Sequence, residues 1–170
     1  MESAKSGPSW LQTIVIGRKP KVTLIRAVLL AVALVLMARF VLLPIRVEGA
    51  SMLPTYKENG INFLNRLAYS WSEPKRGDVV GIRLAGYHIM FLKRIIGLPG
   101  ETVAFHEGHV VVNSVVLDEP YVKNPCDWER APVTLGPNEY FFVGDNRSMP
   151  QSEHTFGRAQ RERIVGRILL

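Results

Sequence analysis

The longest apolar stretch of the chain lies near its N-terminus. From Ala27 to Ile45 it holds nineteen residues with one charge, Arg39. A helix of that length spans about 28 Å, which is enough for the hydrocarbon core of a bilayer. Arg39 lies about two turns before the end of the stretch, where a long side chain can reach the headgroups. The pattern therefore predicts one transmembrane helix over residues 27–45.

Beyond Val47 the pattern changes to short runs rich in Val, Ile and Phe, most of them separated by Gly, Pro, Asn or Asp. No stretch there keeps a helical period over three turns, so strands are expected. The pairs Glu107-Gly108 and Asn113-Ser114 indicate tight antiparallel hairpins. We therefore expect an all-β fold, an antiparallel sandwich or barrel-like domain behind the single N-terminal helix. The runs are INFL, DVVGIRL, HIMFLKRII, ETVAFHEG, HVVVNSVVL, EYFFVGD and RIVGRILL.

Two segments are predicted to connect strands. Leu117 to Val122, LDEPYV, has Pro120 where a central strand would need an N–H, which favours an edge or a connection. Residues 123–137 contain three prolines and a glycine and are expected to form a loop.

The excess of positive charge precedes the β-rich region. Residues 1–46 carry seven Lys or Arg against one acidic residue, whereas residues 47–170 carry fourteen of each sign. A neutral domain offers no basic face to a phosphate backbone, so nucleic acid is not expected as a partner. The positive-inside rule keeps the basic end in the cytoplasm. We therefore expect a single-pass protein of the plasma membrane, with a cytoplasmic N-terminus (1–26), an anchor (27–45) and an extracytoplasmic domain (46–170).

A cleavable secretory signal would share the basic start and the apolar run. Its cleavage site would need small residues at positions −1 and −3. A cut after Ala50 would place Glu48 at −3, and a cut after Ala38 would place Leu36 there. Retention of the segment as an anchor is therefore favoured.

Cysteine and histidine indicate no metal or redox site. Cys126 is the one cysteine, so no internal disulfide can form, and its loop offers no obvious base. The histidines follow no metal-ligand spacing, and we expect them to be exposed. Neither a metal nor another cofactor is expected. The four histidines are His88, His106, His109 and His154.

Ser51 and Lys93 are the candidate catalytic pair. Ser51 lies six residues beyond the apolar segment, which places its hydroxyl near the outer membrane surface. Strand alternation places Lys93 on an apolar face, and burial there would lower its pKa and make a neutral amine available as a base. Taken singly, however, a loop serine is usually structural and a strand lysine usually reaches solvent. The apolar neighbours of Lys93 on that face are Ile89, Phe91 and Ile95.

Four motifs follow the apolar segment in order: SMLPTY at 51–56, RGDVV at 76–80, KRIIGLPGE at 93–101 and GDNR at 144–147. Together they resemble the type I signal peptidase (leader peptidase) family of bacteria. The resemblance extends from Arg46 to the C-terminus. It implies an all-β catalytic domain with an apolar surface against the lipid bilayer. It also implies a membrane-bound serine endopeptidase that acts on the signal peptides of exported preproteins, with Ser51 as nucleophile and Lys93 as general base.

The resemblance further implies how substrate binds. A signal peptide would lie as an extended strand beside the segments that precede Ser51 and Lys93, with small pockets for the −1 and −3 residues. The backbone N–H of Ser51 would donate to the oxyanion. Gly49 stands where some family members carry a serine that supplies a second donor. The expected substrate-binding residues are Gly49, Met52, Phe91 and Leu92.

In this family the GDNR motif supports the active site. Asp145 would pair with Arg94 and hold the strand of Lys93 without touching substrate. Arg147 of the same motif is expected to belong to this support.

Beyond Arg147 the chain departs from the family pattern. Pro150 stands where the family has a serine that orients the base amine. The Asp, Ser, Arg run that usually follows is replaced by Ser152, Glu153 and His154. Either Ser148 or Ser152 takes over the orienting role, or Lys93 is held less firmly.

Two alternatives follow from these features. The departures motivate a catalytically silent homologue that binds signal-peptide-like strands, although the intact Ser51 and Lys93 argue against it. A self-cleaving Ser-Lys regulator would need a DNA-binding or pro-segment where this chain has a membrane span.

Overall fold

The computed structural model describes residues 19–83, 90–124 and 126–169. Two compact units divide the chain, Met1–Phe40 and Val41–Leu170. The expectations for His88 and Ile89 fall outside the described residues.

The first unit contains helix α2, Pro20–Val41. Within the described residues it is the one helix long and apolar enough to cross a membrane, and none of it is buried by the rest of the chain. The sequence predicted this helix but placed its end too late, because residues 42–45 belong to strand β1, Leu42–Arg46. Leu43 precedes Pro44, and the residue before a proline disfavours the helical conformation, so the chain becomes extended there.

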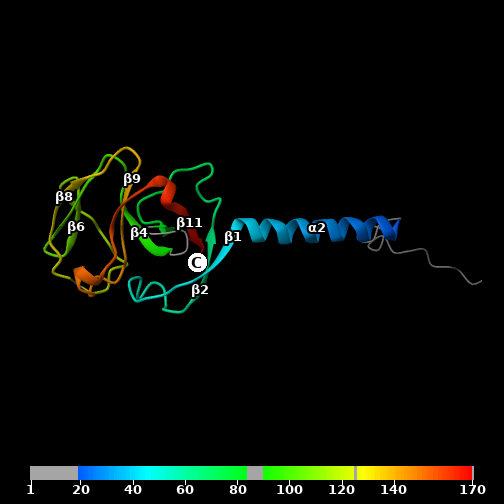
Figure 1. The fold of residues 1–170 in the computed structure, drawn as a ribbon, viewed down its shortest axis with the longest axis horizontal. Coiled ribbons are helices and arrows are strands. Elements are labelled where there is room, and N and C mark those ends of the chain that lie inside the picture. The colour runs from blue at the N-terminus through cyan, green and yellow to red at the C-terminus, as the bar shows by residue number, and fades with distance from the viewer. Residues whose placement is uncertain (1–18, 84–89, 125, 170) are drawn as a thin grey trace, which may run out of the picture. The chain divides into compact units, whose positions relative to one another are not determined.

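The second unit is all-β, as the sequence predicts. Its larger sheet is antiparallel throughout, in the order β1-β2-β11-β3-β4-β9-β10. Figure 1 labels strands β1, β2, β4, β9 and β11 of this sheet. Strand β4, which carries Lys93, pairs with β3 on one side and β9 on the other, so its backbone is held from both edges. The bounds are β2 Ile61–Asn65, β3 Val79–Ile82, β4 Phe91–Gly97, β9 Glu139–Val143, β10 Gly157–Gln160 and β11 Ile164–Leu169.

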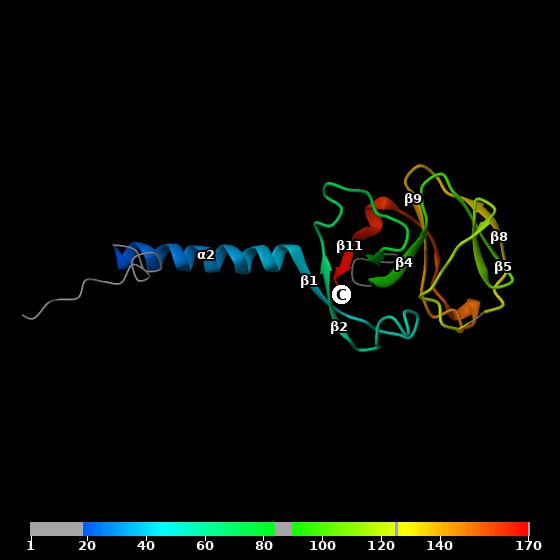
Figure 2. The ribbon, with the colours of Figure 1, turned by 180° about the vertical axis from the view of Figure 1, so that it is seen from behind.

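The smaller sheet has the antiparallel order β7-β6-β5-β8. Figure 2 shows β5 and β8 on the side of β9 away from β1 and β2. The two predicted hairpin turns are confirmed: Glu107 and Gly108 have φ of 49° and 77°, and Asn113 and Ser114 have φ of 49° and 69°. Positive φ at both central residues is what a type I′ hairpin turn requires. The bounds are β5 Thr102–His106, β6 His109–Val112, β7 Val115–Val116 and β8 Arg130–Thr134.

The expectation of a loop over residues 123–137 is wrong, because β8 lies within it. Pro132 is tolerated there since β8 is an edge strand and its pairing with β5 is irregular at that point. The sequence also did not indicate β1 or β10 as strands. LDEPYV is a connection, as expected, and two short 3-10 helices complete the unit, η1 Gln151–Glu153 and η2 Arg161–Arg163.

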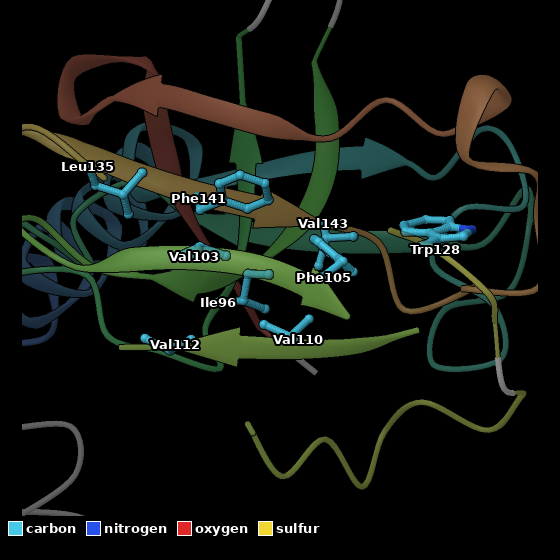
Figure 3. Close-up of a cluster of buried hydrophobic side chains, with 9 residues drawn as sticks. All are labelled: Ile96, Val103, Phe105, Val110, Val112, Trp128, Leu135, Phe141 and Val143. Carbon is cyan, nitrogen blue, oxygen red and sulfur yellow. The ribbon is translucent and has the colours of Figure 1, made fainter. Parts of the chain in front are cut away.

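Alternate side chains of β9 belong to two different hydrophobic clusters. Phe141 and Val143 pack into a cluster with residues of the smaller sheet (Figure 3), whereas Tyr140 and Phe142 pack into a cluster within the larger one. Successive side chains of a strand point to opposite faces, so β9 is apolar on both. Strand β4, which carries Lys93, therefore pairs with a strand that is held by apolar packing on both of its faces.

Candidate active site

Ser51 and Lys93 lie in direct contact. Lys93 Nζ is 2.8 Å from Ser51 Oγ and donates a hydrogen bond to it. The lysine is 2% exposed, and it lies opposite Val80, itself fully buried, in the β3–β4 pairing. Val80 is therefore an apolar neighbour of Lys93, while Ile89, one of the three predicted neighbours, lies outside the described residues.

Burial sets the protonation of this amine. It lowers the pKa of Lys93 from 10.5 to about 8, and the negative charge of Asp145 opposes part of the fall. At pH 7 roughly a tenth of such lysines are neutral, a far larger fraction than for a solvated lysine. The neutral form has a lone pair that can accept the serine proton.

The turn that carries Ser51 is held by the GDNR motif. Asn146 N donates to the Ser51 carbonyl at 3.0 Å, and Asn146 Nδ2 donates to the Ala50 carbonyl at 3.0 Å. Gly144 lies so close that a Cβ there would collide with the Ser51 carbonyl oxygen. The sequence reasoning missed Gly144 and Asn146, although both belong to the motif that pointed to Asp145.

Arg94 and Asp145 form the expected pair. Arg94 Nε and Nη2 lie 2.8 and 2.6 Å from the two carboxylate oxygens, and Arg94 Nη1 donates to the Gly77 carbonyl at 2.7 Å. Asp145 is 1% exposed and also accepts from Thr55 Oγ1 at 2.6 Å. Because Thr55 belongs to the SMLPTY run and Arg94 follows Lys93, one buried carboxylate ties the nucleophile segment to the base strand.

Arg147 is buried in a second ion pair. Its guanidinium pairs with the Glu119 carboxylate, and its Nε donates to the Gly144 carbonyl at 2.9 Å. Glu119 also accepts from the Tyr121 hydroxyl at 2.7 Å, and the Tyr121 ring stacks 3.9 Å from the Arg94 guanidinium carbon. The LDEPYV connection thus packs against both arginines. Neither Glu119 nor Tyr121 was expected there, because a connecting segment gives no sign of what it packs against.

A cavity of about 380 Å³ opens beside Ser51. Its walls come from residues 45–48, before the nucleophile, and residues 90–92, before the lysine, and Gly81 also lines it. Of the expected substrate-binding residues, Phe91 and Leu92 line it. Met52 is 1% exposed and lies in the core with Val47 and Tyr56, whereas exposed Gly49 is outside the lining.

The segment after Arg147 brings neither candidate serine to the lysine. Ser148 is exposed and donates to Asn146 Oδ1 at 2.7 Å, and Ser152 is exposed on η1. Pro150 is exposed as well. In the described part of the chain, the hydrogen-bond partner of the lysine amine is Ser51.

The expectation that the histidines are exposed holds for His106 and His109 but is wrong for His154, which is 4% exposed. Its ring packs edge-on against Trp128, with ring centroids 4.9 Å apart. A chain position next to a 3-10 helix gave no sign of this burial. Among the described residues, no group of three His, Cys, Asp or Glu side chains could hold a metal ion.

A family model described as signal peptidase, peptidase S26, matches residues 21–170. The chain is 34% identical over 151 residues to a probable signal peptidase I-2 of Synechocystis sp., a match that covers 85% of this chain and 68% of that protein. It is 37% identical over 153 residues to signal peptidase I T of Bacillus subtilis, covering 83% and 79% of the two chains. A crystal structure of a signal peptidase I from Enterococcus faecalis aligns with a TM-score of 0.48 at 24% identity, over 58% of this chain and 98% of that one.

Proposed function

The chain belongs to the signal peptidase family, peptidase S26, and we propose that it is a membrane-bound serine endopeptidase that removes signal peptides from exported preproteins by a Ser-Lys dyad. Family membership makes it a peptidase of the signal peptidase type. The observation that supports the dyad is the 2.8 Å contact between the Ser51 hydroxyl and the amine of a lysine that is 2% exposed.

Acylation begins when the neutral amine of Lys93 takes the proton of the Ser51 hydroxyl. Ser51 Oγ then bonds to the scissile carbonyl carbon, and the carbonyl π electrons move onto oxygen to give a tetrahedral oxyanion. When the oxyanion collapses, the C–N bond breaks and the Lys93 ammonium returns its proton to the leaving nitrogen. The mature protein leaves with a free amino terminus, and the signal peptide stays on Ser51 as an ester.

Deacylation repeats the sequence with water. The neutral Lys93 amine takes a proton from water while the water oxygen bonds to the ester carbon. Collapse of the second oxyanion breaks the bond to Ser51 Oγ, which regains a proton from Lys93. The signal peptide is released as a carboxylic acid, and both side chains return to their starting states.

The backbone N–H of Ser51 is the proposed oxyanion donor. In the described part of the chain no backbone or side-chain oxygen accepts a hydrogen bond from it, whereas the carbonyl of the same residue is taken by Asn146. The donor is therefore available to an oxyanion at the position where Ser51 Oγ attacks.

The cavity beside Ser51 is the proposed binding groove for an extended signal peptide. Its two walls are the segments that precede the nucleophile and the base, as β-augmentation by a substrate strand requires. Phe91 and Leu92 are proposed as pocket walls, and buried Met52 as the support beneath them. Gly49, at φ 85°, has no atom within 4 Å of the position of a Cβ, which leaves that side of the backbone open to substrate.

Arg94, Asp145 and Arg147 are proposed as supporting residues. Their guanidinium and carboxylate groups are directed at one another and at backbone carbonyls. They fix Lys93 and Ser51 without touching the reacting atoms.

The lipid bilayer is the proposed surroundings of α2, with the chain before this helix in the cytoplasm and the peptidase domain, from strand β1 onward, outside the plasma membrane. The exposed apolar side chains of α2 support a membrane span, and the basic residues before it support this orientation. On strand β2, Ile61 is 74% and Phe63 is 47% exposed, and strand alternation places both on one face, which suits a domain working at the bilayer surface.

The test is cleavage of a preprotein that carries an Ala-X-Ala site by the full chain in detergent micelles, with the cut mapped by mass spectrometry. We expect one cut after that site, lost in Ser51→Ala and kept in the matched control Ser148→Ala. Binding of the preprotein without any cut would favour the catalytically silent homologue and contradict the proposal.

A further inference from the structure

His154 is a buried polar side chain without a partner. It is 4% exposed, and neither ring nitrogen makes a hydrogen bond to any described residue. Burial of an imidazole without hydrogen bonds is costly, so its placement needs a physical reason.

The ring of His154 faces the turn that carries the nucleophile. A Cβ built on Gly144 would lie 2.8 Å from His154 Nε2 and 2.7 Å from Cε1, and the same atom would collide with the Ser51 carbonyl oxygen. The ring edge and the carbonyl oxygen therefore both border the space that glycine leaves open at residue 144. Trp128 holds the ring from another side, and its own Nε1 donates to the Met149 carbonyl at 3.2 Å.

His154 is neutral at physiological pH. Its pKa is lowered to about 4, first by burial and then by the positive charges of Lys93 and Arg147, while the nearby backbone carbonyls of Ser51 and Thr155 oppose part of the fall. A neutral imidazole carries one N–H donor. It adds no charge beside Lys93, so it does not alter which form of the base is present.

We propose that His154 is a positioning residue for the Ser51–Lys93 pair: with substrate bound, its Nε2–H donates to the Ser51 carbonyl and holds the nucleophile's peptide in line with the lysine. The inference rests on the serine peptidase function proposed above. Asn146 N occupies one lone pair of that carbonyl at 3.0 Å, and the oxygen can accept a second donor. Catalytic hydrogen bonds commonly tighten when substrate binds.

The test compares His154→Phe with His154→Gln in the full chain in micelles. Phenylalanine keeps a ring against Trp128 but has no N–H, whereas glutamine keeps an N–H near the place of Nε2 and has no ring. A positioning role predicts that kcat falls about five-fold in His154→Phe, with KM unchanged, and stays within about two-fold of wild type in His154→Gln. The matched controls, His109→Phe and His109→Gln, lie at an exposed site and are expected to match wild type.

A purely structural role predicts the reverse order, because the ring packing would then matter and the N–H would not. Wild-type kcat in His154→Phe, or a larger loss in His154→Gln than in His154→Phe, would overturn the proposal. If His154→Phe does not fold, the glutamine variant still decides, since loss of kcat in a folded His154→Gln contradicts the role of the donor.

The pH profile gives a second readout. Because His154 is neutral from pH 6 to 9, the apparent pKa of the rise in kcat/KM is expected to stay the same in both variants. A displaced pKa would assign His154 an electrostatic role and overturn positioning. Ser51→Ala and Lys93→Met in the same assay separate the two proposals. If they still cut, the serine peptidase mechanism fails, whereas if they are inactive and His154→Phe is unaffected, only the role of His154 fails.

Discussion

Replacement of Lys93 by methionine is expected to stabilise the protein while abolishing its activity. The folded protein holds this lysine with a pKa of about 8, against 10.5 when it is solvated in the unfolded chain. At pH 7 the unfolded state therefore binds the proton more tightly, by 2.303RT times the difference of the two values, which is about 3 kcal/mol. Because the folded pKa is lowered, this cost is fully present below pH 8 and disappears as pH rises through 10.5.

Methionine has a similar length and needs no proton, so Lys93→Met removes that cost. It also removes the hydrogen bond to Ser51, which contributes about 1 kcal/mol. The net gain in the free energy of unfolding is therefore expected to be about 2 kcal/mol at pH 7. Since the proton-linked part falls to about 1 kcal/mol at pH 10, the advantage of Lys93→Met should have vanished there.

Denaturant unfolding of the full chain in detergent micelles, followed by tryptophan fluorescence at pH 7 and pH 10, measures both values. Other titrating groups cancel when each variant is compared with wild type at the same pH. Lys75→Met is the matched control, because Lys75 is exposed, and it should change stability by less than about 0.5 kcal/mol at either pH. A difference between Lys93→Met and wild type that is the same at both pH values would refute the reasoning, since it would mean that Lys93 has no depressed pKa.

Three further substitutions test the geometry of the site. Lys93→Arg should leave less than a tenth of wild-type activity in the preprotein assay, because a guanidinium stays protonated and cannot act as a base. Circular dichroism should show that the fold is intact. Activity above a tenth of wild type would exclude Lys93 as the base. Gly144→Ala should lower kcat at least about a hundred-fold, because its methyl group displaces the carbonyl of Ser51. In the control Gly136→Ala the new methyl group meets no atom closer than 3.4 Å, so kcat should stay at the wild-type value. Equal kcat values in the two variants would contradict the close packing of Gly144 against Ser51. Asp145→Asn should lower the free energy of unfolding by about 3 kcal/mol, since it leaves the Arg94 guanidinium without its buried counter-charge. A change below about 1 kcal/mol in a denaturant titration would show that the pair is not needed for stability.

The sequence predicted those features of the fold that depend on local pattern. The type I′ turns at Glu107-Gly108 and Asn113-Ser114 follow from pairs of residues that tolerate positive φ, and the apolar run predicted α2. Strand β8 was missed because Pro132 argues against a strand until the position of that strand at the edge of a sheet is known. Edge position is a property of the whole sheet, so a local pattern cannot contain it.

The active site, too, divides into contacts that the sequence motifs predicted and contacts that depend on the whole fold. The contact between Ser51 and Lys93 and the pairing of Arg94 with Asp145 were expected from ordered motifs. The burial of His154 was not, because it depends on the ring of Trp128, twenty-six positions earlier in the chain, and on the missing side chain at residue 144. Contacts between segments far apart in sequence decide such a placement.

The most direct test of the central claim, that neutral Lys93 is the base for Ser51, is the pH dependence of kcat/KM for preprotein cleavage under conditions where chemistry limits the rate. Because only the deprotonated amine accepts the serine proton, kcat/KM should rise about ten-fold per pH unit below the lysine pKa and level off near pH 8. A value of kcat/KM that stays constant from pH 6 to pH 9 would contradict the account.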